Sequence, residues 1–245
     1  MQPELQDVID NCYAAFAFYR QPRRLEASPY RDPAAILATL SSAPLRDLTG
    51  EQIGPYAGWA MTTVGDVDDY KHFLPRILEL AVSVEPSLGF DPPIIAGKLR
   101  YGRWHAWPRE ERAAVHSLFS AAWHHGLEQH TDELDPKGWL TGIALIDGDL
   151  DTALEAWLRS PSPNATLQLA AFVGGEAELI FSDRANRNFW EGAEDAVIER
   201  MRRWLLGEPV ADRLLLASGA VGAADEWHID RALLALDALS PARPR

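Results

Sequence analysis

One stripe of polar residues has the types and spacing that acid–base chemistry needs. Its members, along a helix predicted from residue 66 to about residue 84, are Asp69, His72, Arg76 and Glu79. Steps of three and four residues return a helical side chain to the same face, so the four are predicted to lie together. There His72 would act as an acid or base, Arg76 would clamp an anion, and the carboxylates would orient them. The alternative is a solvated face with weak ion pairs, each contributing about 0.3–0.5 kcal/mol.

A proline lies inside the same predicted helix. Pro75 removes a backbone hydrogen bond, which costs about 3 kcal/mol or more. The apolar pattern nevertheless continues through it, at Tyr70, Phe73, Leu74, Ile77, Leu78 and Ala81. We therefore predict one bent helix, and the strain of the bend favours a functional role for the polar stripe.

A recognisable set of residues lies before and within this helix. Its members are Pro44-Leu45-Arg46-Asp47-Leu48-Thr49, Tyr56-Ala57, Thr62-Thr63, Gly65-Asp66, Tyr70, His72-Phe73-Leu74-Pro75-Arg76 and Glu79-Leu80. In these residues the chain resembles a family of uncharacterised bacterial all-helical proteins, over about its first third and weakly in the helix after Pro108. The family has no assigned activity, so the resemblance implies no catalytic role. Relatives with this pattern carry cysteines near Ser28-Pro29-Tyr30, where this chain has none, which argues against a family metal site here.

A second candidate site is the basic, aromatic turn at residues 100–108. It contains Arg100, Arg103, Trp104 and Trp107. Exposed aromatic and arginine side chains dominate protein–protein contact sites, so the turn is a candidate binding surface. The alternative is that both indole rings fill the gap between two helix ends while the arginine heads point outward.

Metal binding has two further candidates. Three possible ligands crowd the end of the helix that follows Pro108: His124, Glu128 and His130. Histidines also suit a helix C-terminus because of its dipole, which is the simpler interpretation. The acidic segment 147–151 resembles the start of a calcium loop, but Thr152 and Leu158 stand where that loop needs Gly and Glu. The sequence also has no glycine-rich phosphate loop, dinucleotide fingerprint or zinc-protease motif, so we expect no metal and no cofactor.

Composition limits the environment and the partners. Cys12 is the single cysteine, which excludes an intrachain disulfide, and its place in an apolar helical stripe predicts a core residue. The N-terminus does not resemble a signal peptide and no apolar run is long enough to span a membrane, so we expect a cytoplasmic protein. A net charge of −13 disfavours nucleic-acid and membrane partners and favours a basic protein partner.

The elements that position these residues are predicted to be helices. Helix start signals occur at Pro3, Asp32-Pro33, Thr49 with Gln52, Asp66 with Asp69, Pro92-Pro93, Pro108, Asp135-Pro136, Asp149, Ser162-Pro163, Asn188, Pro209 and Asp225. These residue types satisfy or omit the backbone donors that a first helical turn leaves unpaired. Only Leu179-Ile180-Phe181 is typical of a strand, and it is too short to propose a sheet.

The predicted fold class is all-α. We expect a bundle or short curved array of antiparallel helix pairs, HEAT-like at most, with no significant β-sheet. The second half would form the pairs 135–159, 162–206 and 209–239. The whole chain, 1–245, is expected to be a single helical domain, with possible layers at 1–86 and 92–245.

Two functions follow as hypotheses. The first is a helical protein-interaction module, not an enzyme, with an immunity- or antitoxin-like capture of a basic partner as its concrete form. The second is an enzyme or small-ligand binder with a polar site at the Pro75 bend, around His72 and Arg76.

Overall fold

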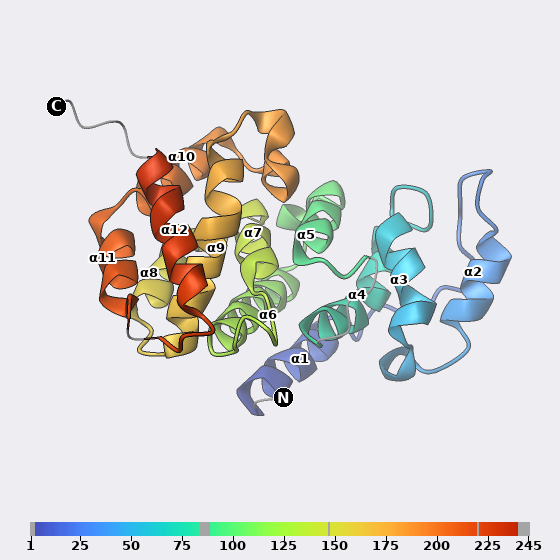
Figure 1. Cartoon of the computed structure of the whole chain (residues 1–245). Helices are drawn as coiled ribbons and strands as arrows, with labels where there is room; N and C mark the ends of the chain where they lie inside the picture. The colour runs from blue at the N-terminus through green and yellow to red at the C-terminus, as the bar shows by residue number, and fades with distance from the viewer. Residues whose placement is uncertain (1–2, 84–88, 147, 220, 240–245) are drawn as a thin grey trace. The chain divides into compact units, whose positions relative to one another are not determined.

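The chain has an all-α fold. A computed structural model describes residues 3–83, 89–146, 148–219 and 221–239 (Figure 1). Within these ranges the regular structure consists of twelve α-helices and four short 3-10 helices, and strand pairing is limited to two isolated bridges. The fold class predicted from the helical periodicity is confirmed.

The helices divide into two compact units, Met1–Ala122 and Trp123–Arg245. The division falls inside helix α6 (Arg109–Leu127), and not between residues 86 and 92, where the sequence suggested a change of layer. No described helix is both long enough and apolar enough to cross a membrane. Each unit is described below by itself.

The first unit contains five complete helices and the beginning of α6. They are α1 (Pro3–Ala15), α2 (Pro33–Leu40), α3 (Gly50–Trp59), α4 (Val67–Val82) and α5 (Pro92–Tyr101). The 3-10 turn Leu45–Asp47 precedes α3, and the turn Trp104–Ala106 follows α5. The helices begin at the residues that carried the start signals, because those side chains and prolines suit a first turn.

Two helices of this unit begin with the reciprocal caps that the sequence predicts. Thr49 accepts a hydrogen bond from the Gln52 backbone N–H, and the Gln52 side chain accepts one from the Thr49 backbone N–H. Asp66 and Asp69 cap α4 in the same way. Each cap satisfies donors that have no partner within the helix, so it fixes where the helix begins and which residues face the core.

Helix α4 is the centre of the first unit. It runs without interruption through Pro75, as predicted, and ends two residues before the predicted position. Its buried side chains are Tyr70, Lys71, Phe73, Leu74, Pro75, Ile77, Leu78, Leu80 and Val82. Helix α1 packs against it, and the buried residues of α1 include Leu5, Ile9 and Cys12. Cys12 is therefore a core residue, and its burial raises the pKa of its thiol to about 12.

The second unit is built around α9. Its helices after α6 are α7 (Lys137–Leu145), α8 (Leu150–Arg159), α9 (Pro163–Phe181), α10 (Asp195–Leu205), α11 (Glu208–Ala217) and α12 (Glu226–Leu239). The predicted pairs are in contact, but α9 packs more extensively on α12, beside which it lies in Figure 1, than on α10. Aromatic rings fill the interior: Trp157 stacks on Trp204 at 5.6 Å between centroids and meets the edge of Trp123 at 4.8 Å.

Two sequence interpretations in the second unit are wrong. Leu179-Ile180-Phe181, which looked strand-like, forms the last turn of α9, because three β-favouring residues cannot override a helix already sixteen residues long. The helix expected directly after Asn188 begins only at Asp195. A 3-10 helix, Asn188–Gly192, precedes it, and Asn188 itself has a φ of 53°, a left-handed conformation that does not start an α-helix.

Candidate functional site

The predicted polar stripe exists on α4, but its members have structural partners. All four side chains are half-buried. Asp69 accepts a hydrogen bond from the Asp66 backbone N–H at 3.1 Å, so it completes the cap of α4. Burial raises the pKa of this carboxyl above its usual range. Its role in the stripe is therefore to start the helix, and it does not orient the histidine.

His72 connects α4 to the segment after α1. Its Nδ1 lies 3.0 Å from the Tyr19 carbonyl oxygen, and because a carbonyl only accepts, Nδ1 carries the hydrogen. The ring also packs edge-on against Phe73 at 4.7 Å between centroids. Burial lowers the pKa of His72, and the hydrogen bond opposes this only in part. Near pH 7 His72 is thus a neutral side chain whose hydrogen bond connects two segments of the first unit.

Arg76 and Glu79 hold two other segments on α4. Arg76 donates from Nε to the Leu48 carbonyl at 2.8 Å and from Nη1 to Glu79 Oε2 at 2.7 Å. Tyr13 of α1 donates its hydroxyl hydrogen to the same carboxylate oxygen at 2.6 Å. Arg76 and Glu79 are in contact, and they join α1 and the turn before α3 to α4, whereas Asp69 and His72 bond to other partners. An anion entering here would have to displace these bonds.

A buried ion pair beside the stripe was missed by the sequence interpretation. Lys71 Nζ lies 2.8 Å from Glu111 Oε2 and 2.8 Å from the Tyr19 hydroxyl, which donates to Glu111 Oε1 at 2.7 Å. Both charged residues are 5% exposed. The ammonium also faces the Trp107 ring at 4.4 Å from its centroid.

The partners of Lys71 decide its charge. Burial alone would lower the pKa of Lys71, but the hydrogen bonds to Glu111 and Tyr19 outweigh it, and the net direction is upward. A signal for the pair exists in the sequence. Lys71 precedes Leu74 and Leu78 by three and seven residues, and Glu111 precedes Val115 and Leu118 by four and seven, which places opposite charges on two apolar stripes.

The tryptophans of the basic turn are not exposed contact residues. Trp104 is 1% exposed and Trp107 is 6% exposed, and Trp107 Nε1 donates to the Gly102 carbonyl at 3.0 Å. The rings fill the space between the end of α5 and the start of α6, while Arg100 and Arg103 lie at the surface. The binding interpretation is thus wrong for the rings, because large apolar groups at a helix junction gain more from burial than from exposure.

The predicted metal ligands do not form a site. His130 Nε2 lies 3.4 Å from Asp225, and Glu128 accepts a hydrogen bond from the Ser160 hydroxyl at 3.3 Å, so the two point to different neighbours. His124, the third candidate, lies at the surface of α6. Among the residues that the structure describes, no three His, Cys, Asp or Glu side chains are placed to hold a metal ion. Asp147 of the calcium-like segment lies outside the described residues.

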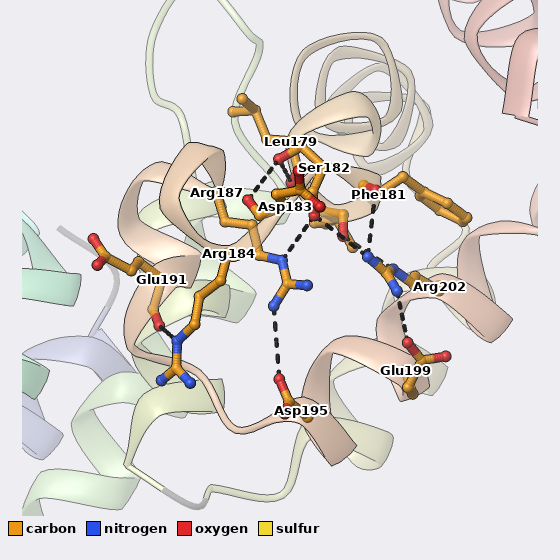
Figure 2. Close-up of polar contacts among 11 residues, drawn as sticks. Leu179, Phe181, Ser182, Asp183, Arg184, Arg187, Glu191, Asp195, Glu199 and Arg202 are labelled. Carbon is orange, nitrogen blue, oxygen red and sulfur yellow. Dashed lines mark hydrogen bonds and ion pairs between the residues drawn. The ribbon is translucent and has the colours of Figure 1, made fainter.

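Arginines gather at the end of α9 in the second unit. Arg187 donates from Nε to the Ser182 carbonyl at 3.1 Å, and Arg202 donates from Nε to the Ile180 carbonyl at 3.1 Å. Figure 2 shows both guanidinium groups turned toward this helix end, with Glu199 bound to the far side of Arg202. Carbonyls and carboxylates already surround these cations. The cluster therefore caps a helix C-terminus and is a poor site for a further anion.

A groove between α2 and α3 differs from these clusters because its polar groups are not all used. We call it the α2–α3 groove. It has a volume of about 310 Å³ and is lined by Ala35, Ile36, Thr39, Glu51, Gln52, Pro55, Tyr56 and Trp59. Gln52 is held by the cap of α3 and by Ser42. Glu51 is exposed, and within the described ranges its carboxylate makes no hydrogen bond or ion pair.

Helix α2 forms one wall of the α2–α3 groove and is unusually apolar for its exposure. Its eight residues, Pro-Ala-Ala-Ile-Leu-Ala-Thr-Leu, include no charged side chain, yet Leu40 is its single buried member. A helix that is apolar on every side is normally covered. The sequence carried this signal in the absence of a polar face between Pro33 and Leu40, and it was overlooked.

The far end of the α2–α3 groove carries a fixed arginine. The Arg31 guanidinium lies 3.7 Å from the centroid of the Trp59 ring, so the indole face is covered by a cation. Tyr56, on the floor, is 1% exposed. The groove therefore presents mostly aliphatic and aromatic side chains, with the Glu51 carboxylate in its lining and the Arg31 guanidinium against Trp59.

Comparisons with known proteins add no assignment. No protein-family model, curated protein or solved structure matches the chain. The resemblance of the first third to a bacterial family therefore stays a prediction, and function has to be argued from the geometry.

Proposed function

We propose that this chain is a helical protein-interaction module that binds a basic partner protein through the α2–α3 groove. The observation that carries the proposal is helix α2, which has no charged side chain and a single fully buried residue, beside a groove with a free carboxylate, Glu51. Burial of apolar surface is the main favourable contribution to most protein–protein association. A toxin-neutralising role of the immunity or antitoxin kind is its concrete form.

The acidity of the chain supports a basic partner. A net charge of −13 accelerates encounter with a positively charged surface and suppresses binding to acidic ones. The polar stripe on α4 gives less support to an enzyme, because His72 and Arg76 are bound to separate backbone carbonyls. The α2–α3 groove is the better candidate because the carboxylate of its lining residue Glu51 makes no hydrogen bond or ion pair within the described residues.

A pair of matched variants tests this function. Ala35 and Ala38 are both exposed residues of α2, but only Ala35 lines the α2–α3 groove. The wild-type chain, Ala35→Arg and Ala38→Arg would each be used as bait in extract of the native host, and any retained protein would then be purified for calorimetry. We expect one basic protein that binds the wild type and Ala38→Arg stoichiometrically, and binds Ala35→Arg at least tenfold more weakly. Equal binding to all three baits, or no stoichiometric protein, would contradict the proposal.

A further inference from the structure

The two ends of the α2–α3 groove carry opposite charges at a defined spacing. Glu51 and Trp59 are eight residues apart on α3, which corresponds to about 12 Å along the helix axis. Glu51 is part of the lining, and the Arg31 guanidinium lies over Trp59, the lining residue farthest along α3. The rest of the lining is mostly apolar, with Thr39 and Gln52 as its uncharged polar members apart from the Tyr56 hydroxyl. A ligand that fits all three parts must be apolar in its middle, basic at one end and acidic at the other.

The arginine end is prepared for a carboxylate. The guanidinium carbon of Arg31 lies over the Trp59 ring, 3.7 Å from its centroid, and this contact restricts the arginine side chain. Within the described residues no carboxylate pairs with it, so its edge N–H donors are available. A guanidinium held in this way binds a carboxylate through two parallel hydrogen bonds, and little side-chain entropy is lost when they form.

A helix suits this groove better than an extended segment does. An extended peptide gains affinity by pairing its backbone with a strand edge, and a groove formed by the two helices α2 and α3 presents no strand edge. Recognition of a proline-rich segment needs open aromatic faces, and here Trp59 is covered and Tyr56 is buried. A helix satisfies its own backbone and offers side chains at intervals of three and four residues.

We propose that the occupant of the α2–α3 groove is an amphipathic α-helix of the partner, with a Lys or Arg facing Glu51 and an Asp or Glu facing Arg31 seven or eight residues away. The inference rests on the proposed function and specifies its recognition. Two helical turns separate such residues by about 10–12 Å, which matches the rise of about 12 Å from Glu51 to Trp59 along α3. Apolar side chains at the positions between them would enter the groove against Ile36 and Pro55.

Two display libraries test the inference directly. One holds 18-residue helical peptides in which the apolar positions and two flanking charge positions are randomised, the latter among Lys, Gln and Glu. The other holds extended, proline-containing peptides of the same composition. Both would be selected on the wild-type chain and counter-selected on Ala35→Arg. We expect enriched helices with a basic residue and an acidic residue two turns apart in one direction only.

Charge exchange supplies the second readout. Glu51→Gln and Arg31→Gln should each weaken an enriched helix about threefold, as expected for partly exposed ion pairs. Glu51→Lys should weaken it about tenfold, and a peptide with Glu in place of its basic residue should restore the affinity. Enriched helices with random charges, or enrichment of extended peptides alone, would overturn the inference and leave the interaction function standing. If no peptide from either library distinguishes the wild type from Ala35→Arg, both proposals fail.

Discussion

The buried pair of Lys71 and Glu111 gives the sharpest prediction about the first unit. Lys71→Met keeps the volume and the apolar stem of the side chain but removes the ammonium group. It leaves the Glu111 carboxylate 5% exposed, with the Tyr19 hydroxyl as its remaining hydrogen-bond donor from this network. The variant therefore tests whether the charge of Lys71 is needed to keep Glu111 in the interior.

The magnitude follows from burial. Removing one partner of a buried ion pair costs about 3–5 kcal/mol, because the other charge stays desolvated. The Arg46–Asp10 pair, in the same unit, is the matched control: its side chains are 48% and 51% exposed and its nitrogen–oxygen distance is 2.7 Å. Arg46→Met should cost at most about 1 kcal/mol. A domain of this size is stable by about 5–15 kcal/mol, so the two variants are easily separated.

Cys12 provides the assay. It is the single cysteine, it is fully buried in α1, and it reports on the first unit without a signal from the second. Pulse alkylation under native conditions then measures how often this unit opens. Lys71→Met should raise the alkylation rate by about a hundredfold to several thousandfold, since each 1.4 kcal/mol is a factor of ten. Arg46→Met should raise it no more than about fivefold.

A double variant separates the pair from its surroundings. In Lys71→Met/Glu111→Gln the charge left behind is also removed, so about 2–3 kcal/mol of the loss should return. If the two single losses simply add, or if Lys71→Met labels no faster than Arg46→Met, the reasoning is refuted, because the ion pair would then contribute nothing that depends on its burial.

Three further predictions concern other contacts. Arg213 donates hydrogen bonds to the carbonyls of Trp157, Leu158 and Ser160 at 2.7, 2.6 and 2.8 Å. Arg213→Met should therefore lower the free energy of unfolding by about 3 kcal/mol or more, measured by denaturant unfolding with tryptophan fluorescence. The control Arg159→Met, at a side chain 78% exposed, should lower it by under about 1 kcal/mol. Gly65→Ala should destabilise the chain, because Gly65 has a φ of +67° and an added Cβ would lie 2.9 Å from Asp69 Oδ2. Gly58 has open space around it, so Gly58→Ala should stabilise α3 by up to about 1 kcal/mol. The two variants should shift the melting temperature in opposite directions. Burial lowers the pKa of His72 below its unfolded value, so the folded state binds the proton less well than the unfolded state does. The free energy of unfolding should therefore fall as the pH drops below about 6.5. His72→Asn keeps a donor for the Tyr19 carbonyl but does not titrate, so it should flatten this part of the plot of stability against pH.

Local features of the fold were predictable because their causes are local. The cap of α3 needs Thr49 and Gln52 three residues apart, and the cap of α4 needs Asp66 and Asp69. Such spacings are visible in any sequence and have one favoured geometry. The continuation of α4 through Pro75 was also visible, since the apolar period does not change phase there.

The candidate site was less predictable because its partners are remote in sequence. The spacing placed His72 on the right face of α4, but its bond is to the Tyr19 carbonyl, 53 residues away. Lys71 and Glu111 are 40 positions apart in the chain, and the apolar pattern around each residue does not indicate which charge in the sequence is its partner. The residue types around Trp104 fitted either an exposed binding residue or a buried residue between two helices. Its burial follows from the packing of α5 against the following turn, which the sequence does not show.

Several basic side chains are used at the C-terminal ends of helices. Lys98 donates to the Ala60 carbonyl at the end of α3, Arg202 to the last carbonyls of α9, and Arg213 to those of α8. These cations neutralise the partial negative charge of helix C-termini, where they stabilise the fold. Over the whole chain acidic residues outnumber basic ones, with a net charge of −13, so its surface attracts basic molecules. A basic partner would meet that surface before the α2–α3 groove engages it, and association should therefore slow steeply with added salt while dissociation, governed by the apolar groove, changes little.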